Sequence, residues 1–264
     1  MGGEVNEPRM RNIRLLLEYD GTEFQGWQRQ PGARTVQGTL ETAIQIVCRH
    51  PAAVLGCART DAGVHALGYV ANFLTESDMP ASRVSLALNG CLPEDVAVLG
   101  AEDAPPEFHA RHSARSRRYM YRITEAPTAV WRRFAFHSHH DLDVDRMAAG
   151  GAHLVGEHDF TSFTPVVNEA GKVCRVIDLV VARDGPHITI SVEATRFVHH
   201  MVRVIAGTLM EVGRGRMEPE QVGDALRKKD RREAGPTAAA CGLTLLVARY
   251  DGDPARELPT IAKP

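Results

Sequence analysis

The chain has 264 residues, of which 44% are hydrophobic, and a formal net charge of −2. This length and composition predict a globular protein with a substantial core, in one large domain or two modest ones. The longest apolar runs are far shorter than a bilayer span, and Met1–Glu4 lacks the features of a secretory signal. We therefore expect a cytoplasmic protein without a membrane anchor, in which any nucleic-acid binding depends on local basic clusters.

Scattered cysteines and a histidine-rich segment are the candidates for metal or redox chemistry. The five cysteines form no Cys-x-x-Cys pair, so reduced thiols are expected and a cysteine zinc site is not. His137–Asp141 has residue types that bind zinc, but no His-Glu-x-x-His motif accompanies it. We expect a polar loop there and no bound metal.

In the first half, hydrophobic spacing predicts alternating strands and helices, beginning with a strand at 13–19. Val36, Leu40 and Val47 share one face of a helix that Thr35 can cap. The remaining expected elements are strands at 54–58 and 69–74, a helix near 82–89 and a strand near 96–101.

The second half has a similar rhythm of strands and helices, although no strong sequence repeat is visible. The expected elements are a strand at 118–123, a helix from Asp143 through Leu154, strands at 173–182 and 187–194 around an Asp184-Gly185 turn, an amphipathic helix with Val198, Val202, Ile205, Leu209 and Val212 on one face, and a strand at 242–250.

These elements divide the chain into four parts. We predict a disordered N-terminus at 1–10, an N-terminal α+β half at 11–112, a C-terminal α+β half at 113–250 and a flexible tail at 251–264.

An aspartate between a cation and a glycine turn is the strongest candidate for chemistry. The run 59–66, Arg-Thr-Asp-Ala-Gly-Val-His-Ala, follows the apolar segment 54–58. Gly63 permits a sharp reversal that leaves Asp61 at a strand end, facing a cleft. Asp61 is therefore a candidate nucleophile or base, although an Asp in such a turn commonly bonds only to backbone amides.

The segment 19–30 is a glycine-flanked loop with polar and aromatic residues. Gln28 and Arg29 can reach phosphates and base edges, and Phe24 and Trp27 offer aromatic faces to unstacked bases. Packing of Trp27 onto the core is an equally good interpretation of that residue.

A basic segment at 108–122 leads into a strand on which Tyr119 and Tyr121 point to the same face. Its five arginines within a dozen residues would repel one another, which favours contact with phosphates over a bare exposed strand. The later run 227–232 is also basic, but a solvated surface at a helix end explains it equally well.

Two further segments complete the set of motifs. Residues 197–203, Phe-Val-His-His-Met-Val-Arg, open the amphipathic helix and place His199 and Arg203 one turn apart. Residues 235–243 read Gly-Pro-Thr-Ala-Ala-Ala-Cys-Gly-Leu.

These segments resemble the tRNA pseudouridine synthase A family, in the family's order, from about residue 13 to residue 246. The family patterns are Tyr-Asp-Gly-Thr with Gly-Trp-Gln-Arg-Gln, Gly-Arg-Thr-Asp-Ala-Gly-Val-His-Ala, Phe-His-Ala-Arg leading to Arg-Tyr-x-Tyr, Phe-Leu-x-His-Met-Val-Arg, and Gly-Pro-Thr-Ala-Pro-Ala-His-Gly-Leu. The chain departs from them at Ala58 for glycine, Tyr69 for glutamine, Ala239 for proline and Cys241 for histidine or glutamine.

The resemblance implies an α+β fold of two ferredoxin-like (RRM-like) halves. Their strands would form one continuous mixed or antiparallel sheet flanked by helices, with the active-site cleft between the halves. The implied activity is a cofactor-independent isomerisation of uridine to pseudouridine at positions 38, 39 and 40, in the anticodon stem-loop of tRNA. A homodimer is also implied.

The resemblance also assigns residue roles. Asp61 would be the nucleophile and Arg203 its ionic partner, Tyr119 would stack on the uracil, Leu243 would pack beneath it, and Arg59 would assist base flipping. Attack at the sugar C1′ and attack at the uracil C6 stay open. The expected RNA contacts are Gln28, Arg29, Phe108, His109, Ala110, Arg111, His112 and Arg115.

Two other interpretations are a noncatalytic RNA-binding module of two RRM-like units and a structural dimer that keeps the fold without the activity. The first would require paired aromatic residues on an open sheet face. The presence of Asp61, Tyr119 and Arg203 together favours the enzyme over both.

Overall fold

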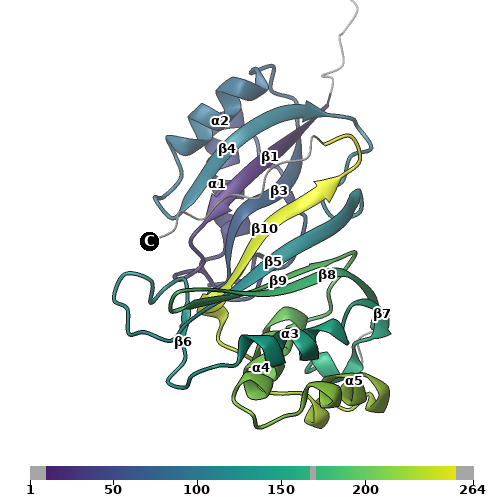
Figure 1. Ribbon diagram of the computed structural model, residues 1–264. Helices are drawn as coiled ribbons and strands as arrows, with labels where there is room; N and C mark the ends of the chain where they lie inside the picture. The colour runs from purple at the N-terminus through teal and green to yellow at the C-terminus, as the bar shows by residue number, and fades with distance from the viewer. Residues whose placement is uncertain (1–9, 167–170, 254–264) are drawn as a thin grey trace, which may run out of the picture.

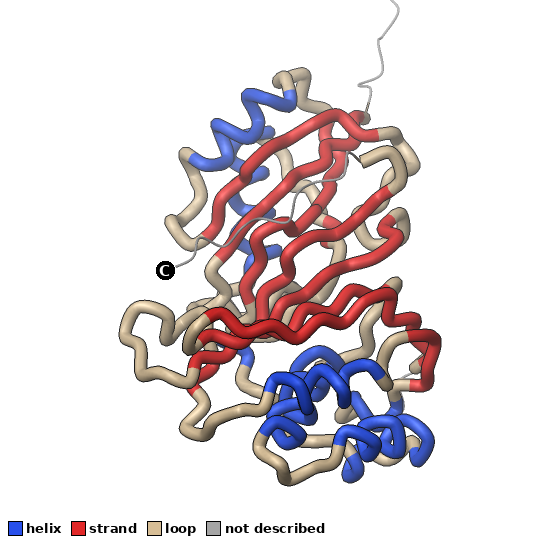
Figure 2. The backbone as a smooth tube through the Cα atoms, in the orientation of Figure 1, coloured by secondary structure: helices blue, strands red, loops and turns tan. Residues whose placement is uncertain are grey.

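The computed structural model describes residues 10–166 and 171–253. The predicted disordered N-terminus and flexible tail lie mostly outside these residues. The described chain forms one open sheet of ten strands flanked by helices (Figure 1). Figure 2 shows the strands as a single twisted surface, with one group of helices at each end of the molecule. No helix in the described part of the chain is long and apolar enough to cross a bilayer.

The first half has the order of elements β-α-β-β-α-β. In the sheet its strands follow the order β4-β1-β3-β2, and each neighbouring pair is antiparallel. This topology is the ferredoxin-like fold that was predicted. The elements are β1 (Arg11–Tyr19), α1 (Val36–Cys48), β2 (Leu55–Gly56), β3 (His65–Thr75), α2 (Ala81–Asn89) and β4 (Val96–Ala104).

The second half repeats this topology, with the antiparallel order β10-β5-β9-β8. Its main elements are β5 (Ala114–Thr124), α3 (Val144–Ala152), β8 (Val173–Asp184), β9 (His187–Ala194), α4 (Met201–Gly213) and β10 (Leu243–Tyr250). The additions to the repeat are β6 (Phe136–His137), β7 (Gly156–Asp159), α5 (Pro219–Lys228) and short 3-10 helices at Thr161–Phe163, Arg231–Glu233 and Ala240–Gly242.

The two halves join through a short parallel contact between β3 and β10. Only Thr244 and Leu245 of β10 pair with β3, at His65 and Ala66. Further along, the same edge of β3 pairs with β2 instead, while β10 continues beside β5. The strands β2 and β10 therefore occupy different stretches of the same edge of β3. The segment that follows β2 lines a cleft together with residues of the second half.

Helix ends agree with the sequence predictions where capping residues were identified. The Thr35 hydroxyl accepts a hydrogen bond from the Gly38 N–H at the start of α1, and the Asp143 carboxylate accepts one from the Arg146 N–H at the start of α3. One continuous hydrophobic cluster extends through both halves. Its aromatic centre includes Trp27, which stacks on Tyr69 with ring centroids 4.2 Å apart. Trp27 is buried, so it packs the loop onto the core.

Several predicted boundaries were wrong. The strand predicted at 54–58 is only two residues long, because the Val54 N–H bonds to the Glu41 carboxylate and its carbonyl to the Gln37 side chain. The strand predicted from 69 already begins at 65. Helix α4 begins at Met201, so Val198 is buried just before the helix, not within it. Helix α5 was implied only by the helix end expected at the basic run 227–232, and its bounds were not predicted.

Candidate active site

A cleft of about 710 Å³ lies where the two halves meet. Its walls come from the segment after β2, from β5, from the start of α4 with the residues before it, and from the first residue of β10. The structure thus brings distant parts of the sequence to one place. The predicted site residues that line this cleft are Arg59, Asp61, Arg111, His112, Tyr119 and Leu243.

The turn that carries Asp61 is held by backbone hydrogen bonds. Gly63 has a φ of 77°, a left-handed conformation that glycine adopts without steric cost, as the sequence predicted. The Val64 N–H donates to the Asp61 carbonyl at 3.2 Å. The loop of the Tyr-Asp-Gly-Thr motif lies beneath the turn, where the Trp27 N–H donates to the Thr60 carbonyl at 3.0 Å. A Cβ on Gly26 would lie 2.7 Å from that carbonyl oxygen, so this loop needs glycine to approach the turn.

Three cationic or basic side chains surround the Asp61 carboxylate. Arg203 Nη1 donates to Oδ2 at 3.1 Å, and Arg203 Nε donates to the Ala238 carbonyl at 2.8 Å, which fixes the guanidinium. His200 Nε2 lies 3.3 Å from Oδ2, and His199 Nε2 lies 3.6 Å from Oδ1. Arg203 comes from the first turn of α4, where unpaired N–H groups add partial positive charge. The site therefore places positive and basic groups on both oxygens of the Asp61 carboxylate.

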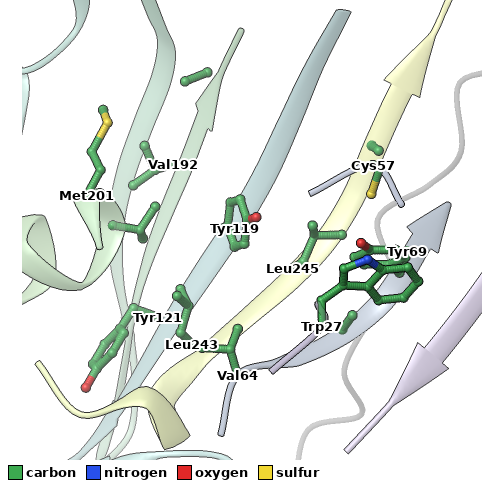
Figure 3. Packing of buried hydrophobic residues seen from close by; sticks show 14 of the residues in the cluster. Trp27, Cys57, Val64, Tyr69, Tyr119, Tyr121, Val192, Met201, Leu243 and Leu245 are labelled. Atoms are coloured by element: carbon green, nitrogen blue, oxygen red, sulfur yellow. The ribbon is translucent and has the colours of Figure 1, made fainter. Parts of the chain in front are cut away.

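Apolar and aromatic side chains form the wall beside the carboxylate. Figure 3 shows Tyr119 on β5, with Leu243 and Val64 close to it. Phe197 packs edge-on against Tyr119, with centroids 5.0 Å apart and planes at 83°. Burial raises the pKa of Tyr119, so its phenol is neutral at physiological pH. A flat, apolar wall next to an anion is suited to a planar ring whose reacting carbon faces the carboxylate.

Cations line the mouth of the cleft. Arg59, Arg111 and Arg196 are exposed and line it from three different segments. Arg117 also lines the cleft but is buried, and it donates to the carbonyl oxygens of Cys57, Arg111 and Thr195. The exposed arginines are available to phosphates, whereas Arg117 holds three wall segments together.

Other predicted RNA contacts lie outside this cleft. Gln28 donates to the Gln37 side chain at 2.7 Å, and Arg29 pairs with Glu41 at 3.0 Å beside α1. Arg115 pairs with Asp251 at the surface.

The Phe-His-Ala-Arg segment is mostly internal. Phe108 packs on Tyr250 with centroids 5.2 Å apart, and its carbonyl accepts a hydrogen bond from Asn12. Ala110 is fully buried and offers no surface to RNA in this structure. His109 is half-buried and contacts the exposed ring of His112, with centroids 4.3 Å apart. His112 and Arg111 are thus the members of this segment that line the cleft.

The late basic run is neutralised locally. Arg227 pairs with Asp224, Lys228 with Glu233, Lys229 with Asp159 and Arg232 with Asp230. The solvated-surface interpretation therefore fits these four side chains.

The sequence motifs contained residues whose part in the site was not recognised. His199 and His200 were part of a motif but received no role, and Arg117 and Arg196 were not singled out as site residues. The only available signal was proximity, because His199 and His200 directly precede the helix that carries Arg203. Nothing in the sequence marks Arg117 as different from the four other arginines around it.

Asp61, His199 and His200 form the one group of three possible metal ligands in the described residues, with ligand atoms within 4.8 Å of one another. Arg203 already neutralises Oδ2, and its positive charge disfavours a second cation at the same carboxylate. We therefore treat the two histidines as partners of the carboxylate. The segment His137–Asp141 does not bring three such ligands together among the described residues.

Two departures from the family pattern lie in the segment before β10. Ala239 has φ −58° and ψ 147°, a conformation that proline also adopts, so alanine leaves the backbone path unchanged. Its carbonyl accepts a hydrogen bond from the Tyr121 hydroxyl at 2.9 Å. Burial raises the pKa of the Cys241 thiol, which is therefore unreactive at neutral pH.

The ferredoxin-like duplication and the pairing of Asp61 with Arg203 across the central cleft are the arrangement that the resemblance to pseudouridine synthases implies. A family model described as tRNA pseudouridine synthase matches residues 16–113 and 151–251. The chain is 39% identical to tRNA pseudouridine synthase A of Acetivibrio thermocellus, over 91% of this chain and 100% of that protein. It is 43% identical to the protein of the same name from Pelobacter propionicus, over 91% and 100%. With that of Paramagnetospirillum magneticum it shares 42%, over 95% and 100%. The chain therefore belongs to the tRNA pseudouridine synthase family.

Proposed function

We propose that this protein isomerises uridine to pseudouridine at positions 38, 39 and 40 of the tRNA anticodon stem-loop, with Asp61 as the nucleophile. Membership of the family makes the protein an isomerase that converts uridine in tRNA to pseudouridine. The observation that carries the finer proposal is the Asp61 carboxylate, held by Arg203 at 3.1 Å in a cleft walled by Tyr119.

Base flipping is part of the proposal because a stacked uridine does not expose its glycosidic bond to a carboxylate. The cleft has room for one nucleotide, with Tyr119 and Leu243 on the wall that would contact the base. Arg59 lies at the mouth, where it can contact the flipped backbone or fill the vacated position.

The reaction requires no change in composition. The N1–C1′ bond breaks with its electron pair on the uracil, the base rotates, C5 bonds to C1′, and the proton lost from C5 is balanced by one gained at N1. Asp61 can form its transient bond at C1′, as the base leaves, or at C6, by addition to the ring. The proposal leaves both routes open.

A noncatalytic RNA-binding module is the second candidate, and the sheet surface disfavours it. Such a module needs exposed paired aromatic residues on its strands. Tyr119 and Tyr121 share a face of β5, but their exposed fractions are only 8% and 0%. These two tyrosines therefore do not form an open platform of paired, exposed aromatic rings.

The decisive experiment replaces Asp61 by asparagine, which keeps the shape of the side chain and removes the charge. We expect pseudouridine formation in an anticodon stem-loop transcript to be abolished, while tRNA binding is largely retained. Asp251→Asn, at an exposed surface position, is the control and should behave as wild type. Appreciable turnover by the Asp61→Asn or Asp61→Ala protein would refute the nucleophile assignment.

The site of action and the assembly need separate measurements. Mapping pseudouridine in tRNA from cells that lack this protein, with add-back of wild type and Asp61→Ala, tests the three positions. The proposal includes a cytoplasmic homodimer, as the family resemblance implies. Sedimentation equilibrium and subcellular fractionation test these two points.

A further inference from the structure

His200 combines three features that a helix-capping residue does not normally have. It is the N-cap of α4, with φ 60° and ψ 5°. The N-caps of α1, α3 and α5, which are Thr35, Asp143 and Glu218, have negative φ and extended backbone. Only Arg49 and Lys229 share a positive φ among the described non-glycine residues, and both follow helix C-termini, where left-handed residues are common. His200 is thus in an unfavourable conformation for its position.

The side chain of His200 does not compensate by capping the helix, since it makes no capping hydrogen bond. Instead the ring turns toward the cleft, and Nε2 lies 3.3 Å from Asp61 Oδ2. An extended N-cap with a serine or aspartate would satisfy a free N–H of α4 without backbone strain. The left-handed backbone therefore serves to point the imidazole at Asp61.

The charges around His200 favour its neutral form. Burial lowers its pKa, the Asp61 carboxylate opposes that shift, and the positive charges of Arg203 and Arg231 and the neighbouring His199 add to it. The rings of His199 and His200 stack with centroids 3.8 Å apart, which limits rotation of the His200 ring. A neutral imidazole with its hydrogen on Nε2 can donate a hydrogen bond to the carboxylate. Because it carries no charge, it does not form a second ion pair beside that of Arg203.

The two carboxylate oxygens of Asp61 are consequently unlike. Oδ2 is contacted by both Arg203 Nη1 and His200 Nε2, at 3.1 and 3.3 Å. The nearest of these bases to Oδ1 is His199 Nε2, at 3.6 Å, and no described residue donates a hydrogen bond to Oδ1. An oxygen that accepts a hydrogen bond from Arg203 and lies 3.3 Å from His200 Nε2 is the poorer nucleophile.

From this asymmetry we propose that His200 is a positioning residue, which with Arg203 anchors Oδ2 and leaves Oδ1 as the oxygen that forms the bond to the substrate. This inference rests on the proposed role of Asp61 as nucleophile. In the C1′ route Oδ1 bonds to C1′ while the N1–C1′ pair leaves with the uracil. In the C6 route Oδ1 bonds to C6 while the C5–C6 π pair moves toward the O4 carbonyl. His200 exchanges no proton in either step.

The test uses His200→Gly, which relieves the left-handed strain while removing the imidazole. We expect the melting temperature to be unchanged or raised, because glycine adopts this conformation without steric cost. With an anticodon stem-loop transcript, we expect kcat to fall about tenfold, as for loss of one polar contact to a charged group. KM should stay at the wild-type value, because the proposed role of His200 is to hold Asp61 and not to bind the substrate.

Two further variants separate positioning from general structure. His200→Gln offers an amide N–H at a reach similar to Nε2 and should recover much of kcat, even though glutamine keeps the unfavourable backbone. His139→Gln alters an exposed histidine that does not line the cleft and is the control, with kcat near wild type.

Wild-type kcat in a folded His200→Gly protein would overturn the inference, as would equal losses in the glycine and glutamine variants. Loss of kcat in His139→Gln as large as in His200→Gly would also overturn it. The proposed function fails separately, if Asp61→Asn remains active. An inactive Asp61→Asn beside a fully active His200→Gly would refute only the role of His200.

Discussion

The hydroxyl of Tyr69 donates a hydrogen bond to the Ala58 carbonyl and accepts one from the Ala58 N–H at 3.4 Å. These are two of the positions at which the chain departs from the family pattern, and they contact each other. Ala58 has no positive φ, so a Cβ at this position causes no backbone strain. The Tyr69 ring, stacked on Trp27, thus holds the start of the segment that leads to Asp61.

Tyr69→Phe removes this hydroxyl and leaves the partly buried Ala58 carbonyl without a partner. We expect the free energy of unfolding to fall by about 1–3 kcal/mol, and kcat to fall with it because the segment 58–61 loosens. Tyr250→Phe is the matched control, since its hydroxyl also donates to a buried carbonyl, that of Ala110, away from Asp61. Urea denaturation and turnover of both proteins provide the test. An equal loss of kcat in the two variants would argue against a specific role for the Tyr69 bond.

Arg117 supports the same segment from the opposite side of the cleft. Its Nε and Nη2 donate to the Cys57 carbonyl at 3.2 and 2.9 Å, and Nη1 donates to the Thr195 carbonyl at 3.2 Å. With 8% of its surface exposed, this arginine connects β5 to the ends of β2 and β9.

Arg117→Ala should lower the free energy of unfolding by about 3 kcal/mol, because several carbonyl groups lose a charged donor. Arg117→Lys should lose less, since an ammonium reaches fewer of them. Arg115→Ala, which removes an exposed ion pair with Asp251, should leave stability close to wild type. Urea denaturation checks all three. Equal stability of the Arg115→Ala and Arg117→Ala proteins would contradict this assignment.

How far the sequence predicts this site depends on the range of the interactions involved. Periodicity and capping predicted α1 and α3, because the determining contacts lie within the element itself. The prediction from hydrophobic pattern failed at Val54, because its backbone groups bond to side chains of α1 and not to a neighbouring strand. Asp61 and Arg203 could be paired only through the family resemblance, since nothing local connects residues so far apart.

The network around Glu193 predicts how stability depends on pH. Glu193 accepts hydrogen bonds from Arg118 Nε at 2.8 Å and Arg249 Nε at 3.1 Å, and another from the Ser116 hydroxyl, so it joins β5, β9 and β10. Burial raises the pKa of this carboxyl, but hydrogen bonds from Ser116 and Arg118 and nearby positive charges outweigh burial, and the pKa is lowered. The folded state therefore binds its proton less readily than the unfolded state.

Stabilisation by a carboxylate with a lowered pKa is complete above the unfolded pKa of about 4.3 and is lost as the pH falls through the folded value. Glu193→Gln should cost about 3 kcal/mol at pH 7, because the partly buried Arg118 and Arg249 lose the charge of their buried partner. The difference from wild type should shrink as the pH drops below about 4. Denaturation with urea at pH 7, 5 and 3.5 measures it. A difference that stays constant over this range would show that the charge of Glu193 is not what stabilises the network.

Arg111 and Arg115 provide a matched test of phosphate contact, because they are four residues apart in the same basic segment. Arg111 lines the cleft, and none of the ion pairs found in the described chain involves it, whereas Arg115 pairs with Asp251. A free cation at the cleft can displace a counterion from tRNA, and each such contact contributes about one unit to the slope of log K against log salt. Arg111→Ala should therefore weaken tRNA binding and reduce this slope by about one unit, while Arg115→Ala should change it much less. Filter binding across a range of salt concentrations measures both slopes. An equal decrease in the two variants would mean that phosphate contact is spread along the segment and is not concentrated at the cleft.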